Sequence, residues 1–291
     1  MWLPDTLVLG PCGIKGCFLL GALKVLEHEK LLGEIRSFVG VSSGAIISMF
    51  LAVGIDLDTV ILMGMETDLL RDVTFDRIRE QRALISSEKL REILAPLITK
   101  KFGKVPTFKE LFELTGRSLT TVAFNLNKMT PRYFSHETTP SVDIVEAVIM
   151  SMAIPYLVQQ IKYEGDVYVD GAFGDNYPIE YIDRGDNKIL GMRVETVASE
   201  VINSIGIFPR VMEHLNVQLG TYRAKQGLNI RHLTLRSEVA ISIPETASRE
   251  DKIRMLKFGY EQGRRFVDEL NGVAQPLVVD AKDIPLPPED T

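Results

Sequence analysis

Apolar residues occur along this chain in short blocks separated by segments with helical spacing, a pattern typical of an α/β fold. Strands are predicted at residues 6–9, 37–39, 119–125, 166–169, 189–194 and 229–235. Helices are predicted at residues 17–29, 45–52, 143–152 and 249–270. Since one helix joins the first two strands, these should form a parallel pair with a right-handed crossover.

The pentapeptide Gly-Val-Ser-Ser-Gly at residues 40–44 stands between the second strand and the second helix. This position is typical of a nucleophile elbow, in which a serine occupies a strained turn and flanking glycines avoid a collision with neighbouring backbone. The Ser42 hydroxyl would then lie at a helix N-terminus, where backbone N–H groups and the helix dipole favour an oxyanion. An ordinary glycine–serine turn is the alternative, because five-residue matches also arise by chance.

A glycine-rich loop follows the first strand, with glycines at positions 10, 13 and 16. The parallel crossover brings this loop and Ser42 to the same edge of the sheet, so its amides can serve as an oxyanion hole. Dinucleotide binding is disfavoured because the spacing differs from G-x-G-x-x-G and because Pro11 removes a donor from the turn.

The predicted strand at 166–169 runs directly into Asp170 and Gly171. A carboxylate at this strand end can reach the serine and act as its general base. An Asx-turn is the alternative explanation of an Asp-Gly pair. A Ser-Asp-His triad with His214 or His232 would also fit the order of an α/β-hydrolase, but both histidines lie within a predicted helix or strand rather than a glycine-marked loop.

Together these motifs resemble the patatin-like phospholipase family. The resemblance covers residues 7–178 and rests on four blocks in the family's order, at residues 13–16, 40–44, 151–155 and 170–172. It implies a three-layer α/β/α fold with a mostly parallel central sheet, a nucleophile elbow and a helical insertion at about 56–120. It also implies a serine lipid acyl hydrolase, a phospholipase A or carboxylic ester hydrolase, that uses no cofactor and no metal.

The resemblance also assigns roles to individual residues. Ser42 and Asp170 would form a catalytic dyad without histidine and pass the acyl group through an acyl-enzyme intermediate. A raised pKa of Asp170 in an apolar site would help, because a carboxylate is otherwise a weak base at neutral pH. The oxyanion would be held by backbone amides of Cys12, Gly13, Ile14 and Lys15. Supporting glycines in these motifs are Gly16, Gly40, Gly44 and Gly171.

The glycine-rich loop departs from the family's usual Asp-Gly-Gly-Gly, because this chain has Gly-Pro-Cys-Gly at residues 10–13. Pro11 cannot donate a hydrogen bond, and Cys12 is bulkier than glycine. We therefore expect an altered oxyanion hole. The same departure favours a second hypothesis, a catalytically silent domain of this fold that binds a lipid or a protein partner.

Composition narrows the remaining possibilities. The chain of 291 residues has a net charge of −6 and no long basic run, which argues against nucleic-acid binding. The same charge is compatible with peripheral membrane contact. Such contact would suit an enzyme that acts on phospholipid or another acyl lipid. We expect one domain over residues 1–281 and a proline-rich tail at 282–291.

The termini and cysteines predict a cytoplasmic protein, because neither a signal peptide nor a transmembrane run is apparent and the chain has two cysteines. Asp166, Asp170 and Asp175 lack the glycine and the terminal glutamate of an EF-hand loop, so they predict no calcium site. Oligomeric state is not predicted.

Overall fold

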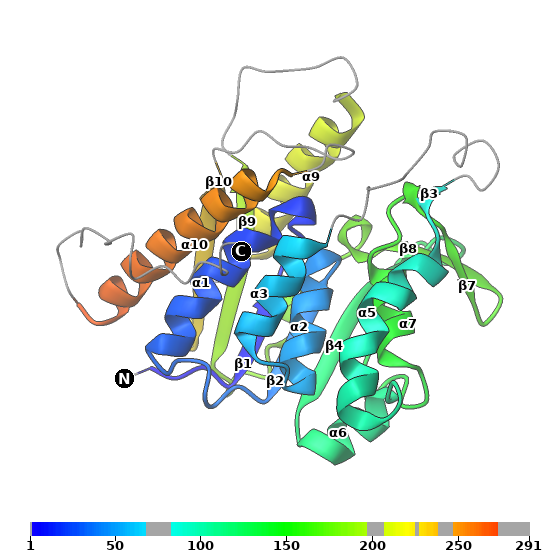
Figure 1. Ribbon diagram of the computed structural model, residues 1–291, viewed down its shortest axis with the longest axis horizontal. Helices are drawn as coiled ribbons and strands as arrows, with labels where there is room; N and C mark the ends of the chain where they lie inside the picture. Colours follow the sequence, from blue (N-terminus) through cyan, green and yellow to red (C-terminus); the bar gives the residue numbers. More distant parts are fainter. Residues whose placement is uncertain (1, 68–82, 197–206, 225–226, 238–246, 273–291) are drawn as a thin grey trace, which may run out of the picture.

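The computed structural model describes residues 2–67, 83–196, 207–224, 227–237 and 247–272. Within them, eight strands form one sheet in the order β10-β9-β1-β2-β4-β8-β7, with β5 paired to β4 (Figure 1). These strands are β1 (Thr6–Leu9), β2 (Ser37–Val41), β4 (Ser118–Asn125), β5 (Thr130–Phe134), β7 (Ile161–Tyr163), β8 (Asp166–Asp170), β9 (Ile189–Thr196) and β10 (Ile230–Ser237). The five strands from β10 to β4 are parallel, and β5, β7 and β8 add antiparallel pairs.

Helices cover both faces of this sheet. The described helices are α1 (Gly16–His28), α2 (Ser43–Val53), α3 (Leu57–Glu66), α5 (Ser87–Phe102), α6 (Phe108–Thr115), α7 (Ile144–Ser151), α8 (Ile179–Ile182), α9 (Ile207–Arg223) and α10 (Arg249–Leu270), with short 3₁₀ turns η1 (Gly13–Lys15) and η2 (Gly171–Phe173). Figure 1 shows α1, α10, α2 and α3 in front of the sheet. The predicted α/β fold with a mostly parallel central sheet is confirmed.

Side chains alternate between the two faces of each central strand, as expected for a sheet buried on both sides. In β1, Leu7 and Leu9 join the large core beneath α1, α2 and α10, whereas Val8 belongs to a smaller core on the opposite face. That smaller core contains Ile179 and Ile182 of α8. The larger core therefore lies on the face that α1 and α2 cover. The glycine-rich loop leads directly into α1, and the turn at Ser42 leads directly into α2.

The described parts of the segment at 56–120 are mostly helical, with one short strand inside the segment and the first residues of β4 at its end. Ser86 caps α5 by accepting a hydrogen bond from the Lys89 amide, and Thr107 opens α6 with a capping box to Glu110. The strand β3 (Ala83–Ile85) pairs in parallel with β6 (Tyr156–Val158), and neither strand was predicted from the sequence. The predicted tail at 282–291 lies outside the described residues. Among the described helices, none has the length and apolarity needed to cross a bilayer.

The strand β4 brings two distant segments together. One edge of β4 pairs with β5 over residues 121–125. The opposite edge pairs first with β2, up to Val41 opposite Val122, and then with β8, from Asp170 opposite Ala123. Because β2 is parallel to β4 and β8 is antiparallel to it, the carboxyl ends of β2 and β8 point at each other along this edge. The residue after Val41 therefore meets Asp170.

Candidate active site

The turn between β2 and α2 has the conformation expected of an elbow. Ser42 is buried and has φ of 56° and ψ of −129°, a sparsely populated conformation for a residue with a side chain. A Cβ on Gly40 would lie 2.5 Å from the Ala45 Cα, and one on Gly44 would lie 2.5 Å from the Leu9 carbonyl oxygen. Both flanking positions therefore accept only glycine. This agrees with the collision between a side chain and neighbouring backbone that is expected at a nucleophile elbow.

Ser42 and Asp170 meet where β2 and β8 converge on β4. The Ser42 hydroxyl donates a hydrogen bond of 2.6 Å to Asp170 Oδ2, and the Ala172 amide donates one of 2.8 Å to Asp170 Oδ1. Asp170 is almost completely buried, and this burial raises its pKa from 3.8 to about 6, although both hydrogen bonds act in the opposite direction. A carboxylate with this pKa is a better base at neutral pH than an ordinary aspartate.

Ser151, the last residue of α7, holds the elbow from the other side. Its Oγ accepts a hydrogen bond of 2.9 Å from the Ser42 amide, and both residues are buried. The block at 151–155 is recognisable in the sequence, but no role was predicted for Ser151. The Asp170 amide donates to the Ala153 carbonyl oxygen at 3.0 Å, so the same block contacts both Ser42 and Asp170.

The glycine-rich loop lies beside the elbow, but not all of its predicted amides can form an oxyanion hole. The Cys12 amide donates to Ser43 Oγ at 3.0 Å, and the Lys15 amide donates to the Cys12 carbonyl oxygen at 2.9 Å. The predicted roles of these two amides are therefore corrected. Gly13 and Ile14 begin the 3₁₀ turn η1, where amide groups have no partner within the turn. The Ser43 amide occupies the equivalent place at the start of α2.

Neither of the histidines considered for a triad is shown in contact with Ser42 or Asp170. His232 lies on β10, where the order of strands places β9 and β1 between it and β2, and its Nδ1 is 3.0 Å from the Tyr177 hydroxyl. His214 is exposed on α9. Among the described residues, the side chain shown to contact the Asp170 carboxylate is that of Ser42. The geometry thus gives no support to a triad.

The three aspartates considered for calcium have separate partners. Asp166 pairs with Lys128 at 2.8 Å, and Asp175 pairs with Arg223 at 2.8 Å while accepting a hydrogen bond from the Tyr133 hydroxyl. Asp170 faces Ser42. Within the described part of the chain, no group of three or more His, Cys, Asp or Glu side chains is arranged to hold a metal ion.

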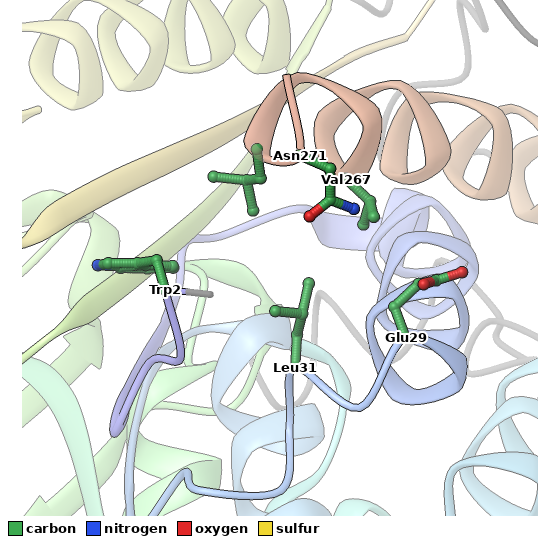
Figure 2. A pocket seen from close by; sticks show the side chains of 6 residues that line it. Trp2, Glu29, Leu31, Val267 and Asn271 are labelled. Carbon is green, nitrogen blue, oxygen red and sulfur yellow. The ribbon is translucent and has the colours of Figure 1, made fainter. Parts of the chain in front are cut away.

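A surface pocket lies elsewhere, between the end of α10 and the segment that follows α1 (Figure 2). It is lined by Trp2, Glu29, Leu31, Val267, Leu270 and Asn271. Glu29 is already paired with Arg264, and Figure 2 shows the Trp2 ring nitrogen on the side away from the other labelled residues. The lining includes none of the residues that surround Ser42.

Comparisons with known proteins agree with this architecture. The model of the family described as patatin-like phospholipase matches residues 7–183, more than half of the chain. The chain is 33% identical over 189 residues to the probable lipid hydrolase 463L of Invertebrate iridescent virus 6, and 32% identical over 194 residues to the uncharacterized protein R571 of Acanthamoeba polyphaga mimivirus. The first match covers 63% of this chain and the second 64%, and each covers 64% of the relative, so less than two thirds of either relative is represented.

Two crystal structures share the fold. VipD from Legionella pneumophila aligns with a TM-score of 0.57 and 19% identity, covering 91% of this chain and 67% of VipD. The type III effector protein ExoU aligns with a TM-score of 0.51 and 16% identity, covering 91% of this chain and 53% of that one. The matched family region contains both the elbow at residues 40–44 and Asp170. The chain therefore belongs to the patatin-like phospholipase family.

Proposed function

We propose that this protein is a serine lipid acyl hydrolase that uses Ser42 as nucleophile and Asp170 as general base. The observation that carries the proposal is the 2.6 Å hydrogen bond from the Ser42 hydroxyl to Asp170 Oδ2 at a strained elbow. A hydroxyl that donates to a buried carboxylate of raised pKa has a proton acceptor already in place. Family membership and the name of one viral relative support an acyl lipid, such as a phospholipid, as substrate.

The first half-reaction transfers the acyl group to the enzyme. Ser42 Oγ forms a bond to the ester carbonyl carbon while its proton passes to Asp170 Oδ2, which leaves the negative charge on the carbonyl oxygen. The amides of Gly13, Ile14 and Ser43 are the donors available to that oxyanion. Collapse of the tetrahedral intermediate breaks the bond to the leaving alcohol, which takes the proton from Asp170.

The second half-reaction releases the fatty acid. Water attacks the acyl carbon and gives a proton to Asp170, and a second tetrahedral intermediate forms against the same amides. The bond to Ser42 then breaks, and the proton on Asp170 returns to Ser42 Oγ. Each group is restored, so the dyad needs no further acid or base.

Labelling and hydrolysis assays test this proposal. Wild type should react with a fluorophosphonate probe at Ser42 and release fatty acid from p-nitrophenyl acyl esters and from phospholipid vesicles. Ser42→Ala and Asp170→Asn should each lower kcat by about 10³-fold or more, because the nucleophile and its base act as one unit. Asp166→Asn is a matched control on the same strand, and its activity should stay within about twofold of wild type, because this carboxylate pairs with Lys128 rather than with Ser42.

Three outcomes would contradict the proposal. Retention of activity in Asp170→Asn would remove the aspartate from the mechanism, and loss of activity in His214→Ala would favour a triad. A folded wild type that neither reacts with the probe nor hydrolyses any ester would support the second candidate, a lipid- or protein-binding domain. The observation that favours this second candidate is the use of the Cys12 amide by Ser43 rather than by an oxyanion.

A further inference from the structure

Ser43 connects the elbow to the glycine-rich loop. It is the first residue of α2, and its Oγ accepts a hydrogen bond of 3.0 Å from the Cys12 amide. The same oxygen lies 3.0 Å from Cys12 Sγ, a contact in which either group can donate. One hydroxyl on the elbow thus contacts both the backbone and the side chain of Cys12, which is 31 residues earlier in the chain.

The position of Cys12 determines where the neighbouring amides point. Gly10 is fixed by its amide, which donates to the Met192 carbonyl oxygen at 2.9 Å, and Pro11 has no amide proton. Gly13 then turns the backbone with φ of 54°, a left-handed conformation that favours glycine. Among the described contacts, Cys12 is therefore the last point at which the loop is attached before Gly13 and Ile14.

The contact between the two side chains persists at neutral pH. Burial raises the pKa of the Cys12 thiol to about 12, although the hydrogen bond with Ser43 acts in the opposite direction. The thiol is consequently protonated under physiological conditions and pairs with Ser43 as a neutral group. A protonated thiol of this kind is a structural group rather than a nucleophile.

We propose that Ser43 is a positioning residue, whose hydroxyl holds Cys12 so that the amides of Gly13, Ile14 and Ser43 converge on the oxyanion beside Ser42. This inference rests on the proposed function and assigns to the Cys12–Ser43 pair the task of shaping the oxyanion hole. An alanine at position 43 keeps the backbone amide but loses both contacts with Cys12. A threonine keeps the hydroxyl and should restore them.

The test compares Ser43→Ala, Ser43→Thr and a remote control, Ser141→Ala, which changes an exposed serine. For each we would measure the second-order rate of fluorophosphonate labelling, kcat and KM for p-nitrophenyl esters, and Tm. Ser43→Ala should lower both the labelling rate and kcat by about 10- to 100-fold, somewhat less than the about 10²- to 10³-fold loss on removing an oxyanion donor outright. KM should change by less than about threefold, because the lost interaction acts in the transition state.

Ser43→Thr should recover the labelling rate and kcat to within about threefold of wild type, and Ser141→Ala should match wild type. Equal labelling of wild type and Ser43→Ala would overturn this inference while leaving the proposed function intact. A threonine variant as slow as the alanine variant, with an unchanged Tm, would also overturn it. A wild type that is not labelled overturns the proposed function and this inference with it.

Discussion

The elbow and the glycine-rich loop lie side by side, yet they are held by different kinds of contact. At the elbow, hypothetical Cβ atoms on Gly40 and Gly44 meet backbone atoms at 2.5 Å, and backbone cannot easily move aside. In the loop, a Cβ on Gly16 meets the Cys12 sulfur at 3.8 Å, an ordinary contact. The loop is instead attached by hydrogen bonds at Gly10 and Cys12.

This difference explains which of the two motifs can change. The turn that carries Asp170 belongs with the elbow, because a Cβ on Gly171 would lie 2.1 Å from the Val122 carbonyl oxygen. Backbone packing therefore positions both Ser42 and Asp170, and it leaves no space for substitution. At Cys12 the loop is attached through the side chain of Ser43, so this position can exchange residues provided that new contacts replace the old ones.

The largest effect should come from Gly44→Ala. Its new methyl group would lie 2.5 Å from the Leu9 carbonyl oxygen and 2.6 Å from that of Gly10, so β1 and α2 would have to separate. We expect a loss of at least about 3 kcal/mol in the free energy of unfolding, at the upper end of overpacking effects. Urea unfolding measures this loss. Wild-type stability would mean that the elbow is no more rigid than the loop.

An intermediate effect is expected from Asp170→Asn. This variant tests whether the buried, ionised Asp170 carboxylate lowers the free energy of unfolding. The folded pKa of about 6 exceeds the ordinary 3.8, so the stability contributed by the protonated carboxyl is present below about pH 4 and is lost as pH rises through 6. A difference of about two in pKa corresponds to about 3 kcal/mol. Asp170→Asn should therefore be more stable than wild type at pH 8 by up to this amount and equally stable near pH 4.

Thermal unfolding at both pH values measures this difference. Wild-type kcat/KM should also rise with pH through about 6 and then level off, because the base must be ionised. An asparagine variant that is less stable than wild type at pH 8 would contradict the burial cost.

The smallest effect should come from Gly16→Ala in the loop. Gly16 has a helical backbone conformation and lies at the start of α1, where an added methyl group would make only ordinary contacts, with the Cys12 sulfur at 3.8 Å and with Ile47 Cδ1 at 4.0 Å. Alanine favours helix over glycine by about 0.5–1 kcal/mol, so a small increase in the free energy of unfolding is expected. Urea unfolding beside Gly44→Ala gives the direct contrast. A loss as large as that of Gly44→Ala would show that the loop is packed as tightly as the elbow.

Much of the fold was predictable because its central strands are apolar and several of its helices, among them α7 and α10, begin with a capping side chain. The strand at residues 6–9 has the predicted bounds, and α10 was predicted at its full length. The three-residue strands β3, β6 and β7 were missed, because segments of this length have too few positions to show alternation. β3 and β6 pair with each other, and β7 pairs with β8.

The site was predictable to the extent that local motifs define it. Ser42 directly follows a strand and Asp170 ends one, and each lies beside glycine, a local signal that sequence patterns can show. Ser43 and Ser151 carry no such signal. Their partners, Cys12 and Ser42, lie 31 and 109 residues away in the chain, so their roles depend on tertiary contacts. The hydrogen bond from the Cys12 amide to Ser43 Oγ could not be predicted from the sequence for the same reason.

The convergence of β2 and β8 on β4 has a consequence for the time at which the site appears during synthesis. Ser42 and its elbow glycines leave the ribosome early, whereas β4 follows at Ser118–Asn125 and Asp170 only after β8. A nascent chain shorter than 170 residues contains Ser42 but not Asp170. Under the proposed mechanism, reactivity at Ser42 would therefore report the completion of folding rather than its beginning.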